Sequence, residues 1–482
     1  MSAASLRLEE DLLGTLEVPA EAYYGIQTLR ALNNFHLSGI PMSQYSQLVV
    51  ALAMVKQAAA DANRKLGYLT PAKYAAITEA CTRLIQGEHH DQFVVDMIQG
   101  GAGTSANMNA NEVIANLALE AMGHAKGEYQ HLHPNDDVNM AQSTNDAYPT
   151  AVRVGLLLVH DTLLSSLDSL VQALAAKGAE FDHVLKMGRT QLQDAVPMTL
   201  GQEFRAFAAA LRQDLEQLRR LAPQLLGEIN LGGTAIGTGL NADPRYQGLA
   251  VERLAAISGK PLRPAADLIA ATSDMGDFVA FSGMLKRLAV KLSKVSNDLR
   301  LLSSGPRTGI SEINLPACQP GSSIMPGKVN PVIPEAVNQV AFEVIGNDVA
   351  LTLAAEAGQL QLNVMEPLIA YKLFDSIRLL QRAMDMLREQ CIVGITANEE
   401  RCRTLMENSI GLVTALNPYI GYKNATRIAR QALMNGCGIL ELVREQGLLD
   451  EAMLAEVLRP ENMIAPRLIP ARNDADVEDE QA

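Results

Sequence analysis

The sequence predicts an all-α protein organised around a long central helical bundle, and two observations support this prediction. The 482-residue chain has 4% aromatic residues, no Trp and 48% hydrophobic residues, with abundant Ala, Leu and Met. These side chains favour helices because they lose little rotamer freedom there. Apolar residues also recur in alternating steps of four and three, which places them on one face of a helix. Several such stripes in one region are typical of a helical bundle.

Four apolar stripes can be followed in chain order. They consist of Leu163, Leu167, Leu170 and Leu174; Leu211, Leu215 and Leu218; Phe281, Leu285, Leu288, Leu292, Val295, Leu299 and Leu302; and Leu373, Ile377, Leu380, Met384 and Leu387. Stripes that continue around their helices would also pack against further copies of the chain. From the position of these helices we expect three domains: residues 1–142, 143–396 and 397–482.

Polar loops separate the helical segments. They are rich in Gly, Pro, Asn, Ser and Thr, which form turns and end helices, and they comprise residues 99–105, 133–145, 188–197, 232–241 and 303–331. Functional side chains are often found on loops that a rigid scaffold positions. The acidic segment 472–482 has no apolar pattern, and we expect it to be a disordered tail.

The charge balance restricts the possible partners and location. The net charge of −14 disfavours nucleic acid and anionic membranes by repulsion. The first residues include acids where a signal peptide would need a basic region and an apolar core. Apolar runs such as Val154–Val159 are far shorter than the roughly 20 residues of a membrane span. We therefore expect a soluble, cytoplasmic protein.

Three familiar site motifs are incomplete. Gly327-Lys328 lacks the earlier Gly and the following Ser or Thr of a phosphate-binding P-loop. Gly237-Thr238-Gly239 lacks the last Gly of a dinucleotide fingerprint. The histidine pairs at 89–90 and at 131 and 133 lack acidic partners at metal-ligand spacing, so no metal site is predicted.

Residues 321–331, GSSIMPGKVNP, combine hydroxyls, a lysine and an amide between Gly and Pro. One interpretation is a flexible surface loop with a solvated lysine. The other is an anion clamp, in which Lys328 and Asn330 hold a carboxylate and Ser322 or Ser323 faces the reacting carbon. The spacing alone does not decide between them.

The same segment resembles, position for position, the signature of the aspartase/fumarase superfamily. The similarity extends from about Leu8 to about Leu448 and is closest to the aspartase branch. It is carried also by DLLGTLEVPAEAYYGIQTLRALNNF, QGGAGTSANMNANEVIAN, HPNDDVNMAQSTNDAYPTA, KMGRTQLQDAVPMTLGQEF, LGGTAIGTGLN and AEAGQLQLNVMEP. The resemblance implies an α-helical homotetramer with a twenty-helix core and active sites that each take segments from three subunits. It implies no required cofactor; activation by Mg²⁺ is a further possibility, for which no ligand site is legible.

The implied reaction is the reversible anti elimination of ammonia from L-aspartate to give fumarate. An enediolate forms when the Cβ proton leaves, and preorganised donors stabilise its extra charge. The resemblance assigns the β-carboxylate to Thr104, Ser143, Thr144 and Ser323, the α-carboxylate to Lys328 and Asn330, and the amino group to Asn145, Thr190 and Gln191. It assigns Ser322 as the general base, which needs backbone N–H groups and a nearby cation to stabilise its alkoxide.

Two alternatives to the aspartase interpretation stay open. A class II fumarase, which hydrates fumarate to L-malate, usually carries His where this chain has Gln191, and reads SSND where this chain reads STND. Glu335, shared by both branches, is expected to form a hydrogen bond with Gln191. A non-catalytic structural relative would have no need of Ser322, Lys328 or Thr104, yet all three are present.

Overall fold

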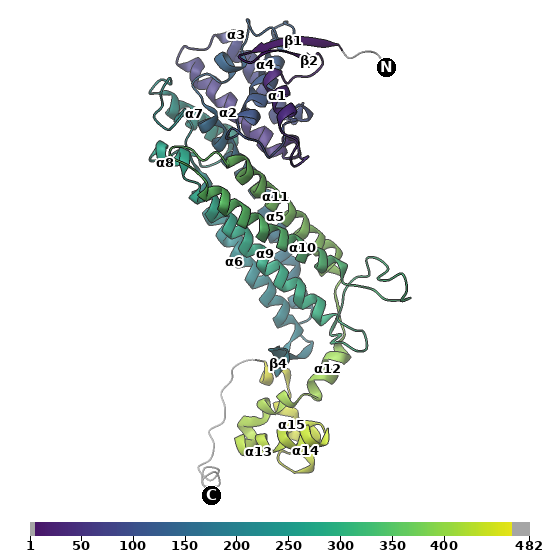
Figure 1. The fold of residues 1–482 in the computed structure, drawn as a ribbon. Coiled ribbons are helices and arrows are strands. Elements are labelled where there is room, and N and C mark those ends of the chain that lie inside the picture. Colours follow the sequence, from purple (N-terminus) through teal and green to yellow (C-terminus); the bar gives the residue numbers. More distant parts are fainter. Residues whose placement is uncertain (1–4, 465–482) are drawn as a thin grey trace. The chain divides into compact units, whose positions relative to one another are not determined.

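The structure, a computed structural model, describes residues 5–464 and is mostly helical (Figure 1). The chain forms two compact units. Among the described residues, the first contains 5–166, 214–290 and 340–382, and the second contains 167–213, 291–339 and 383–464. Five long helices, α5, α6, α9, α10 and α11, contribute residues to both units.

The α-helices follow one another with short connections over much of the chain. They are α1 (Ile26–Asn34), α2 (Ser46–Lys65), α3 (Pro71–Ile85), α4 (Thr104–Ala121), α5 (Thr144–Glu180), α6 (Leu200–Leu226), α7 (Tyr246–Ser258), α8 (Leu268–Ser273), α9 (Gly276–Leu302), α10 (Val332–Glu356), α11 (Glu366–Gln390), α12 (Glu399–Glu407), α13 (Val413–Asn435), α14 (Ile439–Glu445), α15 (Glu451–Val457) and α16 (Pro460–Met463). Short 3-10 turns occur at η1 (Met42–Gln44), η2 (His90–Gln92), η4 (Ile392–Gly394) and η5 (Ile410–Leu412), and one π turn at η3 (Pro134–Val138).

Within residues 5–464 the strands form four two-stranded sheets, which were not predicted from the sequence. They are β1 (Leu6–Asp11) with β2 (Gly14–Pro19), β3 (Leu185–Thr190) with β4 (Gln193–Thr199), β5 (Glu228–Ile229) with β6 (Arg263–Pro264), and β7 (Ile313–Asn314) with β8 (Thr396–Ala397). Only the β5–β6 pair is parallel. The segment 188–197, expected to be a loop, contains most of the β3–β4 hairpin.

The predicted apolar stripes are confirmed. Every residue of the four stripes is at most 5% exposed, and the stripes lie on α5, α6, α9 and α11. Polar contacts add to this packing, since Asp348 of α10 accepts hydrogen bonds from Ser282 and Lys286 of α9 at 2.8 and 2.6 Å. Figure 1 shows these long helices running side by side.

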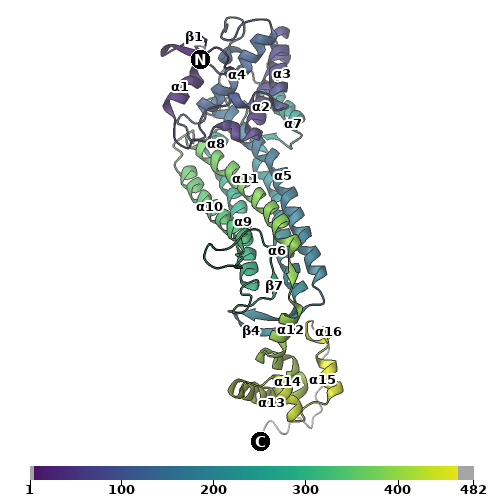
Figure 2. The same ribbon diagram turned by 90° about the vertical axis from the view of Figure 1, so that its right-hand side faces the viewer.

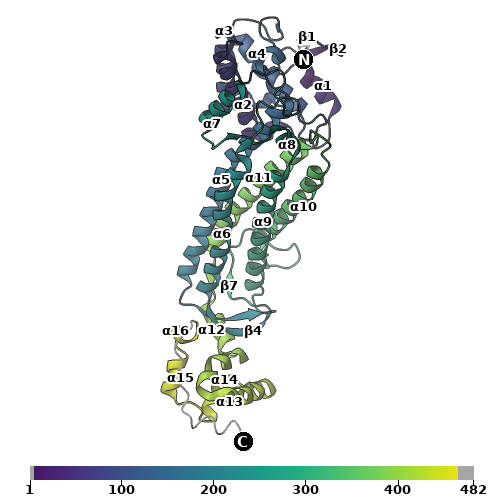
Figure 3. The same cartoon turned by 90° about the vertical axis from the view of Figure 1, so that its left-hand side faces the viewer.

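Around the long helices, each unit has shorter helices of its own. In the first unit α2 packs against α3 and against α7, which is distant in sequence (Figure 3). In the second unit α13, α14 and α15 surround a separate apolar core that includes Leu416, Ile428, Val443 and Leu454 (Figure 2).

Helix α5 is the one helix among residues 5–464 that is long and apolar enough to cross a membrane by length and composition. About half of its most apolar window is buried (56%), as expected for the core helix of a bundle. The three predicted domains stay a prediction, and the predicted tail at 472–482 lies outside the described residues.

Candidate active site

The glycine loop before α4 presents Thr104 at the start of that helix. Gly101, Ala102 and Gly103 all have positive φ angles of 91°, 54° and 89°. A Cβ on Gly103 would lie 2.4 Å from the Tyr148 ring, so no larger residue fits. The exposed Thr104 hydroxyl donates to the Gly101 carbonyl oxygen at 2.7 Å. Thr104 thus lies at the positive end of a helix, where an anion is stabilised, and its hydroxyl must rotate from Gly101 to donate to one.

The start of α5 is fixed by a reciprocal cap. Ser143 Oγ accepts a hydrogen bond from the Asn145 backbone N–H at 3.2 Å, and Asp146 Oδ1 accepts one from the Ser143 N–H at 2.9 Å. Asp146 Oδ2 accepts from the N–H groups of Gly232 and Thr234 at 2.9 and 3.0 Å. Burial raises the pKa of Asp146 to about 6, although these donors oppose the rise. Asp146 therefore joins the loop after β5 to the first turn of α5.

The N-terminal turns of α4 and α5 are joined by Asn107. Its Nδ2 donates to Thr144 Oγ1 at 3.1 Å. The fully buried Lys56 Nζ donates to the side-chain oxygens of Asn107, Asn139 and Gln142 at 2.7, 2.8 and 2.9 Å. Burial lowers the pKa of Lys56 to about 7, whereas three oxygens that can only accept favour its ammonium form. Because Lys56 fixes the orientation of the Asn107 amide, Thr144 accepts from Asn107 and keeps its own proton free for a ligand.

Asn145 follows on the same turn and is held from two sides. Its Nδ2 donates to the Ala235 carbonyl oxygen at 2.8 Å, and the Asn230 side chain donates to its backbone oxygen at 3.0 Å. The four predicted residues of the first unit thus lie at two helix N-termini that Asn107 connects.

In the second unit, Thr190 and Gln191 lie at the exposed tip of the β3–β4 hairpin. Gln191 and Leu192 form its two-residue turn with φ angles of 54° and 63°. This turn geometry suits the twist of a hairpin but normally selects Gly, Asn or Asp. Left-handed backbone costs other residues about 1–2 kcal/mol each, so the turn is held under strain. Strain of this kind is often found at functional sites.

A buried ion cluster anchors this hairpin. Glu312 is fully buried, and its two oxygens lie 2.8 Å from Lys186 Nζ and 2.8 Å from Arg189 Nη1. Lys186 also pairs with Glu203 at 2.5 Å. Burial lowers the pKa of Lys186, but the two carboxylates outweigh it and raise the pKa above the ordinary value. These contacts fix the strand that leads to Thr190.

The segment 315–331 between β7 and α10 is irregular (Figure 1), and Ser322 lies in the middle of it. Its Oγ accepts hydrogen bonds from the backbone N–H groups of Ile324 and Met325 at 3.2 and 3.1 Å. Two N–H donors aimed at one hydroxyl oxygen would stabilise a negative charge there. The side chain is partly buried, while Ser323 and Lys328 are exposed.

The base of the serine loop is closed by polar contacts. The Gly321 N–H donates to the Lys328 carbonyl oxygen at 2.8 Å, and Asn330 Nδ2 donates to the Gly321 oxygen at 2.7 Å. A Cβ on Gly321 would lie 2.6 Å from that Lys328 oxygen, so the closure requires glycine. Asn330 therefore uses one amide N–H to close the loop and keeps the other for a ligand.

Glu335 lies in the first turn of α10. Across residues 5–464, no hydrogen bond joins its carboxylate to Gln191, and the expected contact between these two side chains is not formed within the chain.

The family comparison covers most of the chain. Residues 14–346 match the family described as "Lyase", and residues 412–465 match the one described as "Fumarase C C-terminus". The chain belongs to the fumarase/aspartase superfamily.

Curated superfamily members match over nearly the full length. The chain is 81% identical to an aspartate ammonia-lyase of Pseudomonas aeruginosa over 469 residues, which cover 97% of this chain and 99% of that protein. It is 55% identical to an aspartate ammonia-lyase of Escherichia coli K12 over 463 residues, covering 96% and 97%.

Solved superfamily structures share the fold. A "fumarate lyase:delta crystallin" from Brucella melitensis bound to cobalt is 58% identical with a TM-score of 0.93, covering 96% of this chain and all of that one. A class II fumarase from Schistosoma mansoni is 36% identical with a TM-score of 0.90 over the same shares. The predicted fold class, a mostly helical superfamily fold, is confirmed.

The superfamily resemblance named side chains that are expected to contact a ligand. It did not name the buried side chains that position them. Lys56, Asn107, Asp146 and Glu312 are buried and were not predicted. One signal was present, since Lys56 interrupts the apolar run at 48–60, where a lone cation must find partners. The roles of all eleven predicted site residues stay predictions.

Proposed function

We propose that the chain is an aspartate ammonia-lyase, which removes ammonia from L-aspartate to give fumarate and catalyses the reverse addition. The observation that carries this proposal is the 55–81% identity to curated aspartate ammonia-lyases over at least 96% of the chain. The class II fumarase from Schistosoma mansoni is 36% identical. Gln191 supports the same choice, because a neutral amide oxygen can accept a hydrogen bond from a departing ammonium.

We propose that the β-carboxylate binds at the joined N-termini of α4 and α5. The hydroxyls of Thr104, Ser143 and Thr144 lie there with the positive ends of two helix dipoles, and the Thr144 proton is free. Charge grows on this carboxylate when the Cβ proton leaves. Donors that the fold already orients strengthen as that charge grows and need no reorganisation.

Ser322 is proposed to remove the Cβ proton. The N–H groups of Ile324 and Met325 supply the backbone stabilisation that a serine base requires. Lys328 on the same loop is proposed to bind the α-carboxylate together with Asn330 and to supply the nearby positive charge. Ser323, next to the proposed base, is proposed to add a contact to the β-carboxylate. The exposed hairpin tip would bring Thr190 and Gln191 to the amino group.

We further propose a homotetramer with active sites shared between subunits. Phe342, Val349 and Leu353 form a stripe on α10 and are 62%, 56% and 64% exposed in the single chain. An apolar stripe of this kind on a long helix fits burial against another subunit. Contacts between subunits would also provide side-chain partners for Gln191 and Glu335, which have none within the part of the chain that the structure describes. Cytoplasmic location stays a prediction.

The assay that tests the proposed activity offers the purified protein L-aspartate or L-malate and follows fumarate by its ultraviolet absorbance. Fumarate from aspartate and none from malate is the expected result. Fumarate from malate alone would establish a fumarase, and no product from either substrate would favour the non-catalytic relative.

A further inference from the structure

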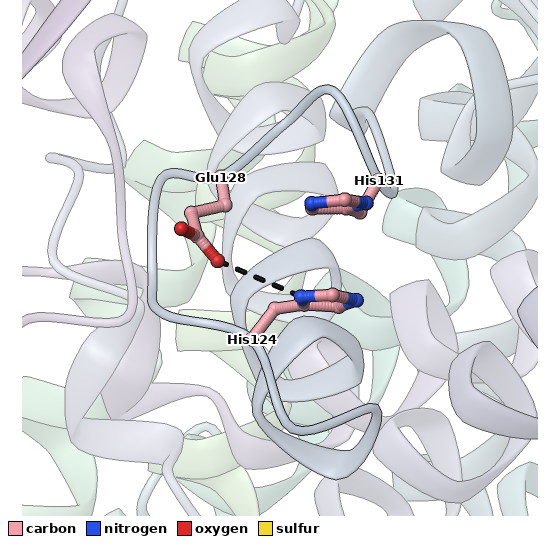
Figure 4. A group of neighbouring side chains, drawn as sticks. All are labelled: His124, Glu128 and His131. Carbon is pink, nitrogen blue, oxygen red and sulfur yellow. Dashed lines mark ion pairs between the residues drawn. The ribbon is translucent and has the colours of Figure 1, made fainter.

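Two histidines and a glutamate meet in the loop that follows α4, in the first unit (Figure 4). One ligand atom from each of His124, Glu128 and His131 lies within 4.8 Å of the other two. The two imidazole rings stack with centroids 3.8 Å apart and planes 5° from parallel. Glu128 Oε2 lies 3.6 Å from His124 Nδ1. The sequence had grouped His131 with His133, but the fold places it beside His124 and an acid.

Backbone contacts hold this cluster in place. The His124 N–H donates to the Leu119 oxygen at 2.9 Å, and the His131 N–H donates to the Glu128 oxygen at 3.0 Å. Glu128 Oε2 also accepts from the Ala125 N–H at 2.9 Å, which fixes the carboxylate toward His124. The loop therefore positions the backbone of all three residues and the Glu128 carboxylate before any ligand arrives, which lowers the entropic cost of binding.

We propose that His124, Glu128 and His131 bind a first-row transition-metal ion of the Co²⁺ to Zn²⁺ type. Two imidazole nitrogens and one carboxylate oxygen suit these ions, whereas Mg²⁺ and Ca²⁺ prefer oxygen ligands. Metal–ligand distances near 2.0–2.2 Å require the atoms to move closer together. His131 is exposed and can tilt out of the stack, so that both nitrogens point at one ion. Solvent at this partly exposed site completes the coordination.

The proposed ion has a structural role. None of the predicted active-site residues belongs to the cluster, and the same loop is fastened to the segment before α1 and to α4. Lys126 Nζ donates to the Glu21 oxygen at 3.0 Å, and the Gly127 N–H donates to Asn116 Oδ1 at 2.8 Å. A bound ion would cross-link this loop and stabilise the folded state by an amount that grows with the logarithm of the ion concentration once this exceeds the Kd.

The test uses full-length protein without an affinity tag, treated with chelator and titrated with Co²⁺ while visible absorbance and melting temperature are followed. We expect one Co²⁺ per chain with nitrogen-ligand absorbance bands and a higher melting temperature. His124→Gln and His131→Gln should each weaken Co²⁺ binding by about tenfold or more, since even outer-shell changes cost that much at metal sites. Mg²⁺ should give no change that depends on these residues.

His183→Gln is the matched control, because His183 is exposed and pairs with a single acid, Glu399, at 3.2 Å. This variant should bind Co²⁺ like the unmodified chain. The proposal is overturned if His124→Gln and His131→Gln bind Co²⁺ as tightly as the control. It is equally overturned if the unmodified protein binds no Co²⁺ at millimolar concentration. Neither outcome bears on the aspartate assay.

Discussion

The side-chain amide of Asn107 donates a hydrogen bond from Nδ2 to the Thr144 hydroxyl at 3.1 Å, and its Oδ1 accepts one from the buried Lys56 at 2.7 Å. Asn107→Asp should reverse the first contact. A carboxylate can only accept hydrogen bonds, so the Thr144 hydroxyl would donate to it and not to a ligand. We expect kcat/KM for aspartate to fall by about 10–100-fold, the scale of one lost donor to a developing charge. An unchanged melting temperature would show that the fold is intact. Full activity in the variant would mean that Thr144 does not donate to substrate.

The second prediction concerns the proposed base. Ser322→Ala should reduce kcat by several orders of magnitude and change KM little, because the hydroxyl acts on the proton and contributes little to binding. Ser303→Ala is the control, since the Ser303 hydroxyl donates to the Arg300 oxygen at 3.3 Å at the end of α9 and is not a predicted site residue. If Ser322→Ala kept more than about a tenth of the original kcat, another group would have to be the base.

The third prediction concerns the branch choice at Gln191. Gln191→His should weaken aspartate turnover by about 1–3 kcal/mol in the activation free energy, the range for a mispaired polar contact. It should not create an efficient fumarase, because Thr144 and the aspartase-like segments 329–335 (VNPVIPE) and 362–367 (LNVMEP) are unchanged. Assays with L-aspartate and L-malate check both statements. Malate turnover equal to the original aspartate turnover would show that this single residue sets the specificity.

The fourth prediction concerns the sharing of active sites. Thr104 belongs to the first unit and Ser322 to the second. If different subunits supply them to one site, mixing inactive Thr104→Ala and Ser322→Ala proteins under refolding conditions should restore part of the activity. Hybrid tetramers would contain some sites with both residues intact. Mass spectrometry confirms that hybrids formed, and hybrids without activity would place both residues in one chain.

The fifth prediction concerns acid stability. His160 is 2% exposed, its Nε2 has no hydrogen-bond partner among residues 5–464, and burial lowers its pKa from 6.5 to about 4. The unfolded chain therefore binds a proton that the folded chain does not. The free energy of unfolding decreases by up to about 3 kcal/mol as the pH falls from 6.5 to 4. His160→Phe removes this titration. The melting temperature of the variant, compared with that of the unmodified protein at the same pH, should therefore rise as the pH falls from 6.5 to 4. A difference independent of pH would contradict the assigned shift.

The sequence by itself determined the bundle, because the spacing of apolar residues is a local property that each helix repeats. The stripe from Phe281 to Leu302 is buried as the spacing predicts. The polar loops were recognised for the same local reason, since Gly, Pro and small polar residues end helices. Gln191 lay inside a segment expected to be irregular, and the structure places it in a strained hairpin turn. The two-residue strands β5 to β8 carry too few residues for a period of two to be visible, whereas β1 to β4 have six or seven residues and were missed although their length allows such a pattern.

The tertiary structure decided which groups meet. Lys56, Asn107 and Thr144 come from three helices, and their hydrogen bonds depend on packing that no spacing encodes. The same holds for His124 and His131, which the loop after α4 brings into a stack. A sequence pattern reports the face on which a side chain lies. The partner of a buried charge is set by long-range packing, because burial without a partner costs several kcal/mol and the fold must supply one.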